Sequence, residues 1–266
     1  MNRPKKSLGQ NFLIDKNVVQ KILNLVNIKK KNIVEIGPGT GKLTEEIIKE
    51  NPKSLLLIEK DNKLSELLKE RFFKNNNVSI FNEDILSFKL ENKIKKSSII
   101  IGNLPYNISS QILVKLIKLN KWPPNYSKLV LMFQKEVAEK LLAREKTSLF
   151  SRITIISNWR LKIKDHFHVS RNCFFPKPNV DSTVLVFEPI INNKYKIKDL
   201  ENLEKVTHIF FSSKRKMINK AFAKIFNNFE FHAKKLNLDL TKRPNEINGE
   251  DFYKICEYFE KFGKKV

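Results

Sequence analysis

The tetrapeptide Asn103-Leu104-Pro105-Tyr106 carries residue types well suited to chemistry on an amine. The carboxamide oxygen of Asn103 and the backbone carbonyl of Leu104 can each accept one N–H bond. Two such acceptors would hold an aromatic amine such as adenine N6 and favour a pyramidal nitrogen with a usable lone pair. Pro105 stiffens the turn that presents the carbonyl, and Tyr106 offers a face on which a base can stack. An ordinary turn rich in Asn and Pro is the alternative interpretation.

A glycine-rich segment, Gly37-Pro-Gly39-Thr-Gly41, has the position of a nucleotide-binding loop, between an apolar run and a helical pattern. Glycines allow the backbone to approach a ligand closely, and a helix N-terminus offers free N–H groups. Glu59 ends the next apolar run, where α/β nucleotide sites hold ribose hydroxyls. Lys42 stands where a dinucleotide motif has its third glycine, so the loop instead resembles the S-adenosylmethionine loop of class I methyltransferases. A tight structural turn is the alternative.

Asp84 lies just beyond a third apolar run at 78–81. Its carboxylate could accept the adenine amino group of the same cofactor, because carboxylates accept N–H donors. A turn acid or a helix cap is the alternative interpretation. Like Asn103 and Glu59, Asp84 follows a predicted strand, and ligands bind at the carboxyl edge of a parallel sheet.

Short apolar runs alternate with helical patterns over the first 150 residues. Buried strands are predicted at 32–37, 55–58, 78–81, 99–101 and 129–133, and helices at 18–26, 44–49, 62–74, 109–119 and 135–143. This alternation predicts parallel βαβ units and therefore a doubly wound α/β sheet.

The pattern changes after residue 150. Residues 161–169 and 183–187 read as strands with no helix between them, which predicts an antiparallel hairpin at one edge of the sheet. Helices are predicted at 200–211, 214–226, 230–237 and 250–262. We therefore predict an α/β domain at 1–191, with a lead-in at 1–31, and a small all-helical domain at 192–266.

The composition excludes several classes of protein. The 266 residues are 41% hydrophobic, which is enough for a buried core. Two cysteines exclude a disulfide scaffold and a cysteine-rich metal site, and the four histidines show no metal-binding spacing. No apolar run reaches the roughly 20 residues of a membrane helix, and the N-terminus does not resemble a secretory signal. We expect a protein of the reducing cytoplasm.

The net charge of +23 suits a polyanionic partner such as RNA. The excess is mostly lysine, and the chain is also rich in Asn, Ile and Phe, so AT-rich codon usage is an alternative source of part of it. Lys214, Arg215 and Lys216 form a basic run that could contact RNA phosphates. A solvated charge run is the alternative at these three positions.

Five segments together resemble the KsgA family of small-subunit ribosomal RNA adenine dimethyltransferases along the whole chain. They are LGQNFL at 8–13, VEIGPGTG at 34–41, GNLPYNIS at 102–109, FQKEV at 133–137 and FFPKPNVDS at 174–182. The basic run at 214–216 also resembles an element of that family's C-terminal domain. The resemblance implies a class I methyltransferase fold of the Rossmann type.

The resemblance also implies a function and site residues. The expected enzyme transfers methyl groups from S-adenosylmethionine, without a metal, to N6 of two adjacent adenosines in a hairpin near the 3′ end of 16S rRNA in the small subunit. Its cofactor residues would be Asn11, Leu13, Gly37, Glu59, Asp84 and Asn103. Phe174 would pack on the flipped-out target base, although a core position is the alternative in a chain with 20 phenylalanines. We expect a monomer.

Three other functions compete with this interpretation. Macrolide-resistance methyltransferases act on large-subunit RNA with the same fold, but they typically read SQNF and NIPYH where this chain has GQNF at 9–12 and NLPYN at 103–107. A DNA adenine methyltransferase would need a target-recognition domain, which nothing here resembles. A non-catalytic ribosome-assembly binder would not need the intact glycine loop together with Glu59 and Asn103.

Overall fold

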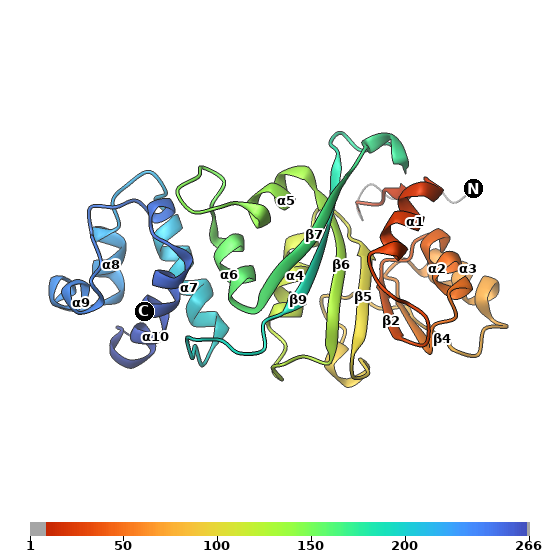
Figure 1. Ribbon diagram of the computed structural model, residues 1–266, viewed down its shortest axis with the longest axis horizontal. Coiled ribbons are helices and arrows are strands. Elements are labelled where there is room, and N and C mark those ends of the chain that lie inside the picture. Colours follow the sequence, from red (N-terminus) through yellow and green to blue (C-terminus); the bar gives the residue numbers. More distant parts are fainter. Residues whose placement is uncertain (1–8, 265–266) are drawn as a thin grey trace. The chain divides into compact units, whose positions relative to one another are not determined.

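The predicted strands assemble into one seven-stranded sheet, in the order β4-β3-β2-β5-β6-β9-β7 (Figure 1). The computed structural model describes residues 9–264; Leu8 of the first motif and the start of the predicted lead-in lie outside the described residues. The strands are β2 (Asn32–Ile36), β3 (Ser54–Ile58), β4 (Val78–Phe81), β5 (Ser98–Asn103), β6 (Tyr126–Gln134), β7 (Leu161–Val169) and β9 (Ser182–Pro189).

The sheet is mixed, with parallel pairing from β4 to β6 and an antiparallel strand, β9, beside β6. Both of its faces are buried: Ile33 and Ile99 on one face and Val34 and Ile100 on the other are all at most 5% exposed. This two-sided burial explains why the parallel strands are continuous apolar runs rather than alternating ones. The predicted fold class, including the antiparallel edge, is confirmed.

Helices alternate with the strands along the chain, as the sequence predicts. They are α1 (Lys16–Asn24), α2 (Lys42–Lys49), α3 (Asn62–Phe72), α4 (Ser109–Ile117) and α5 (Lys135–Leu142). The Asp15 and Asp61 carboxylates accept backbone N–H bonds at the starts of α1 and α3 and so cap these helices. Buried side chains of α1, α2 and α3, including Ile22, Ile47 and Leu68, belong to one hydrophobic cluster with the strands.

A two-stranded antiparallel sheet joins distant parts of the chain. It consists of β1 (Phe12–Leu13) and β8 (Phe174–Phe175), with Phe12 opposite Phe175 and Leu13 opposite Phe174. The pairing continues beyond the strands, where the Ile14 N–H donates to the carbonyl of Cys173 at 2.8 Å. The sequence did not predict this sheet, because each strand has only two residues. It brings the first and last of the five sequence motifs together.

The chain divides into two compact units, and the second comprises residues 139–161 and 190–266. Its helices are α6 (Arg152–Arg160), α7 (Leu200–Phe211), α8 (Asn219–Ile225), α9 (Phe229–Leu236) and α10 (Gly249–Phe262). Phe210 contacts Phe222 and Phe252 edge-on in its core. Within residues 9–264, no helix is long and apolar enough to span a bilayer.

Two features of this unit differ from the predicted elements. Helix α6 was not predicted, and it packs with the C-terminal helices: the Tyr253 hydroxyl donates to the carbonyl of Ile155 at 2.8 Å. The segment 139–161 therefore groups with the C-terminal helices, although the predicted boundary at 191 includes it in the α/β domain. The helix predicted at 214–226 begins only at Asn219, and the preceding basic residues form turns.

Candidate active site

The glycine-rich loop after β2 contains three residues in the left-handed region. Gly37, Gly39 and Gly41 have φ angles of 67°, 59° and 80°, which side-chain-bearing residues rarely adopt. A Cβ atom on Gly39 would lie 2.9 Å from the ring of Phe12, and Gly41 is the N-cap of α2. The loop thus requires glycine for conformation and for space, and it exposes the N–H groups that begin α2.

Glu59, just after β3, is only 7% exposed and is held by two backbone donors. The Gly39 N–H donates to Oε2 at 3.0 Å and the Asp61 N–H donates to Oε1 at 2.9 Å. Burial raises the pKa of Glu59, while these two hydrogen bonds act in the opposite direction. Each carboxylate oxygen retains a second lone pair, so Glu59 can also accept bonds from the two hydroxyls of a ribose.

Asp84 is a turn acid that also belongs to the lining of the cavity described below. Its Oδ1 accepts the Leu86 N–H at 2.9 Å, as a turn acid does. Its role as an acceptor for the adenine of the cofactor stays a prediction. Its Oδ2 accepts a bond from the ammonium of Lys60 at 2.7 Å. The hydrogen bond from Lys60 lowers the pKa of Asp84, so the group is an ionised acceptor near neutral pH.

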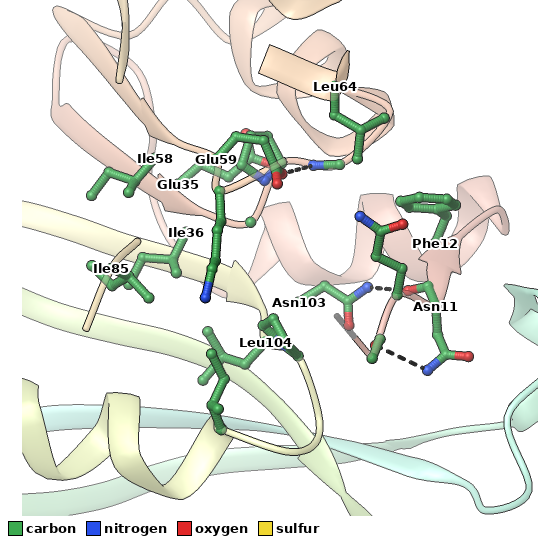
Figure 2. A pocket seen from close by; sticks show the side chains of 18 of the residues that line it. Asn11, Phe12, Glu35, Ile36, Ile58, Glu59, Leu64, Ile85, Asn103 and Leu104 are labelled. Carbon is green, nitrogen blue, oxygen red and sulfur yellow. Dashed lines mark hydrogen bonds between the residues drawn. The ribbon is translucent and has the colours of Figure 1, made fainter. Parts of the chain in front are cut away.

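Asn103, at the carboxyl end of β5, has its carboxamide oriented by the backbone. Its Nδ2 donates to the carbonyl oxygen of Asn11 at 2.9 Å. The carboxamide oxygen consequently lies on the side away from Asn11 (Figure 2), and among the described residues it accepts no hydrogen bond. The group is therefore held as an acceptor for an incoming N–H donor.

Leu104 and Tyr106, which follow Asn103 in the tetrapeptide, are also held in place. Leu104 is 1% exposed, so its side chain anchors the turn in the core. The Tyr106 hydroxyl lies 2.6 Å from Oγ of Ser182, the first residue of β9. Burial raises the pKa of Tyr106, which keeps the phenol neutral. The ring is thereby tied to the sheet at its hydroxyl.

Residues 9–13, which we call the N-terminal strap, form one wall of the site. Gln10 donates to Asp61 Oδ2 at 3.3 Å, Asn11 accepts the bond from Asn103, and Phe12 lies against Gly39. The sequence motif at 8–13 predicts that the strap belongs to the site. It does not predict that Asp61 holds the strap through Gln10. Nothing in the sequence indicates that an aspartate at the start of α3 also accepts a bond from residue 10.

These elements surround one cavity at the carboxyl edge of the sheet (Figure 2). Its empty space is about 1170 Å³ including solvent at its mouth, compared with about 300–1,000 Å³ for typical small-ligand sites. It is lined by every residue predicted for the cofactor or for catalysis: Asn11, Leu13, Gly37, Glu59, Asp84, Asn103, Leu104, Pro105 and Tyr106. The close-packed glycines, the buried carboxylate of Glu59 and the cavity volume fit a nucleoside cofactor such as S-adenosylmethionine.

Comparison with known proteins identifies the family. The family model for "Ribosomal RNA adenine dimethylase" matches residues 1–261. The chain belongs to this adenine dimethylase family. The small-subunit methyltransferase A of Pelagibacter ubique (strain HTCC1062) is 42% identical over 261 residues, covering 97% of each chain, and that of Mycoplasma mobile (strain ATCC 43663 / 163K / NCTC 11711) is 38% identical over 256 residues, covering 96% of this chain and 97% of the relative.

Solved structures agree with this membership. A dimethyladenosine transferase from Plasmodium falciparum has a TM-score of 0.79 at 27% identity, covering 95% of this chain and 99% of that one. The 23S rRNA methyltransferase ErmE has a TM-score of 0.67 at 20% identity, covering 94% and 100%, and shows the shared fold. The predicted family and the methyltransferase class of enzyme are confirmed for this adenine dimethylase family member.

In this member of the adenine dimethylase family, Phe174 does not line the cavity. It is 3% exposed and belongs to the hydrophobic cluster, opposite Leu13 in the β1–β8 sheet. Its neighbour Phe175 is 57% exposed. The core position that the sequence left as an alternative is therefore what the structure has, and stacking of Phe174 on a base stays a prediction that requires the ring to leave the core.

The three basic residues at 214–216 differ from one another in the structure. The ammonium of Lys214 donates to the backbone carbonyl of Ser148, so it links the basic run to the segment 139–161 of the same unit. Arg215 and Lys216 are exposed. Contact with RNA phosphates stays a prediction for all three, and it is best supported for the exposed pair.

Metal binding is not expected from the sequence. Within residues 9–264, no three His, Cys, Asp or Glu side chains gather in a way that could hold a metal ion. That the reaction needs no metal stays a prediction of the sequence.

Glu35 is a buried carboxyl group of the cavity that the sequence did not single out. It lies in β2, is 1% exposed and accepts a bond from the hydroxyl of Thr44 at 2.7 Å. Burial raises its pKa from 4.5 to about 8, and the nearby Glu59 adds to the increase. The sequence does show a charged residue inside an apolar run at 32–36, which could have marked Glu35 as unusual. Its protonation state, however, depends on burial and on Thr44 and Glu59, which only the fold brings next to it.

Glu35→Gln should change how stability depends on pH. Between pH 4.5 and 8 the unfolded chain ionises Glu35 while the folded chain keeps it protonated, so wild-type stability falls as pH rises. The amide cannot ionise and can still accept the Thr44 bond. We expect the variant to gain on the wild type by roughly 3–5 kcal/mol in free energy of unfolding over this range, levelling off above pH 8.

Urea unfolding of the cofactor-free proteins at several pH values measures this difference. Glu66→Gln, at an exposed position of α3, is the control and should show no such pH-dependent gain. A Glu35→Gln difference that stays constant from pH 4.5 to 8 would contradict the buried, protonated state.

Proposed function

We propose that this chain transfers methyl groups from S-adenosylmethionine to N6 of two adjacent adenosines, twice each. The substrate is a hairpin near the 3′ end of 16S rRNA in the small ribosomal subunit. The enzyme acts in the cytoplasm as a monomer during small-subunit biogenesis. Its family, the cavity and the five sequence motifs support this proposal together.

The orientation of the Asn103 carboxamide is the observation that carries the proposal. Because Nδ2 is engaged by the Asn11 carbonyl, the oxygen is left to accept one N–H of the adenine amine. The Leu104 carbonyl accepts the other N–H, and the two bonds draw the nitrogen toward a pyramidal, nucleophilic geometry. When bound, the cofactor supplies a methyl group that its sulfonium already activates.

Catalysis in this scheme comes from positioning and hydrogen bonding rather than from a strong base. Tyr106, tied to Ser182, offers its ring face to the adenine, which must leave its stack to enter the cavity. The amine loses its proton after transfer, so no residue must remove it beforehand. The neutral phenol of Tyr106 and the amide of Asn103 suit this role because neither needs to change charge.

The choice of the small subunit rests on sequence. The relatives from Pelagibacter ubique and Mycoplasma mobile carry the name small-subunit methyltransferase A. Two residues separate the small-subunit group from the macrolide-resistance group. They are Gly9, which begins the GQNF motif, and Asn107, which follows the tetrapeptide, and both are as in the small-subunit group. A large-subunit substrate is the competing function.

Methylation of purified subunits tests the proposal. Small and large subunits from a strain lacking this protein are incubated with the enzyme and tritiated S-adenosylmethionine, and labelled nucleotides are mapped. We expect dimethyladenosine at two adjacent positions of 16S rRNA. Label on the large subunit alone would establish the competing function, and label on neither would reject both.

Charge reversal at Arg215 and Lys216 should weaken binding to the small subunit. Both side chains are exposed, and each lost phosphate contact should reduce the log–log salt dependence of the affinity by roughly 0.7 if the contacted RNA is single-stranded. Binding of R215E/K216E is measured by sedimentation at several salt concentrations. K234E/K235E, the same charge change on exposed residues of α9, is the control; equal salt slopes in the two variants would remove these residues from the interface.

A further inference from the structure

The β1–β8 sheet has two faces of different character. Leu13 and Phe174 lie opposite each other on the inner face and are 6% and 3% exposed. Adjacent residues of a strand point to opposite faces, so Phe12 and Phe175 share the outer face, where Phe175 is 57% exposed. The sheet thus buries one aromatic ring and presents its neighbour to solvent.

The outer face is continuous with the wall of the cavity. Phe12 lines the cavity and lies against the glycine loop at Gly39. Residues directly opposite in an antiparallel pair have Cα atoms about 5.5 Å apart when they are hydrogen-bonded partners. Phe175 therefore lies beside Phe12, a residue of the cavity wall, on the outer face of this sheet.

The surroundings of Phe175 suit a nucleobase attached to a phosphate backbone. Lys177 and Arg171, on either side of β8, are exposed, and Ile14 adds an apolar surface that is 41% exposed. The acid in this segment, Asp181, already accepts the backbone N–H of Arg171 at 2.9 Å. The Nη1 of Arg171 donates to the carbonyl of Asn179 at 3.0 Å, and its side chain remains exposed. An aromatic face beside exposed cations is the combination that binds unpaired RNA bases.

We propose that Phe175 is a stacking platform for the nucleobase next to the adenine being methylated. This inference rests on the proposed function, in which two adjacent adenosines are modified at a single Asn103. While one adenine occupies the cavity, its neighbour loses a stacking partner. Phe175 replaces that partner and holds the second adenine at the mouth of the cavity.

Substitutions at Phe175 test the platform on small subunits. Base–aromatic stacking is worth about 1–3 kcal/mol, so Phe175→Ala should raise KM about 5- to 150-fold with little change in kcat. Phe175→Trp should retain the wild-type KM, whereas Phe175→Leu should resemble the alanine variant. Cofactor affinity measured by calorimetry should be equal in all of them, which also verifies folding.

A readout without methyl transfer separates this inference from the proposed function. A single-stranded RNA of adenines with one 2-aminopurine is titrated with each variant, and its fluorescence change reports stacking. We expect the wild type and Phe175→Trp to change the fluorescence of 2-aminopurine. The Phe175→Ala and Phe175→Leu variants should not change it. Phe73→Ala, at a ring 72% exposed beside α3, is the control and should behave as the wild type.

Two outcomes would overturn the platform. Wild-type KM and fluorescence in Phe175→Ala would show that the ring contacts no base. Wild-type behaviour of Phe175→Leu would show an apolar contact, as with a protein partner, instead of stacking. Failure of the wild type to methylate small subunits would instead count against the proposed function, and the fluorescence assay would still decide the role of Phe175.

Discussion

Asn103→Ala should lower the rate of methyl transfer by about 10²–10³-fold, the range found when one oriented hydrogen-bonding group is removed from an active site. The carboxamide oxygen is expected to hold the amine in its reactive geometry, and alanine has no acceptor to replace it. Loss of the Nδ2 bond to Asn11 also frees the strap, so cofactor affinity should fall modestly. Binding to the small subunit should be retained.

Single-turnover rates with tritiated S-adenosylmethionine measure the chemical step apart from product release. Asn103→Asp is informative beside alanine, because its carboxylate keeps acceptor oxygens but cannot donate to the Asn11 carbonyl; we expect it to be similarly slow. Asn120→Ala, at a surface carboxamide that donates to Glu91, is the control. A rate for Asn103→Ala within threefold of the wild type would show that the amine clamp is not the source of catalysis.

Glu59→Gln should raise the dissociation constant for S-adenosylmethionine on the order of a hundredfold. The carboxylate accepts N–H bonds from Gly39 and Asp61 on its two oxygens, and an amide must turn an NH₂ group toward one of these donors. An unsatisfied buried donor costs about 1–3 kcal/mol, and hydrogen bonds to a charged group contribute about 1.5–3 kcal/mol. The same amide is a poorer acceptor for ribose hydroxyls.

Calorimetry with S-adenosylmethionine measures this affinity, and steady-state rates at saturating cofactor measure the remaining activity. We expect kcat to change much less than affinity, because Glu59 is not expected to touch the reacting amine. Glu66→Gln, the exposed control, should bind normally. Normal cofactor affinity in Glu59→Gln would exclude the assigned ribose contact.

The sheet and the cofactor loop were predictable because their signals are local. Apolar runs such as 32–37 and 55–58 identify buried strands, and glycines directly after a strand identify a loop that must approach a ligand. Once the strands are parallel, their carboxyl ends meet at one edge. Glu59, Asp84 and Asn103 were therefore expected at the same place, and the cavity contains all three.

The remaining features depend on contacts between distant residues. A shift of one residue in the β1–β8 register would exchange the environments of Phe174 and Phe175, and the sequence FF does not say which ring is buried. The bond from Lys214 to Ser148 and the orientation of Asn103 by Asn11 likewise join segments far apart in the chain. Helix α6 was overlooked because its buried positions do not follow a clear amphipathic stripe.

The pairing of β1 with β8 links the residues that line the proposed cofactor cavity to the proposed platform for RNA. If the strap covers the cofactor and Phe175 stacks on RNA, as we propose, movement of the strap to exchange the cofactor also disturbs the strand that carries Phe175. We therefore expect the four methyl groups to arrive in separate visits to the particle rather than in one uninterrupted series.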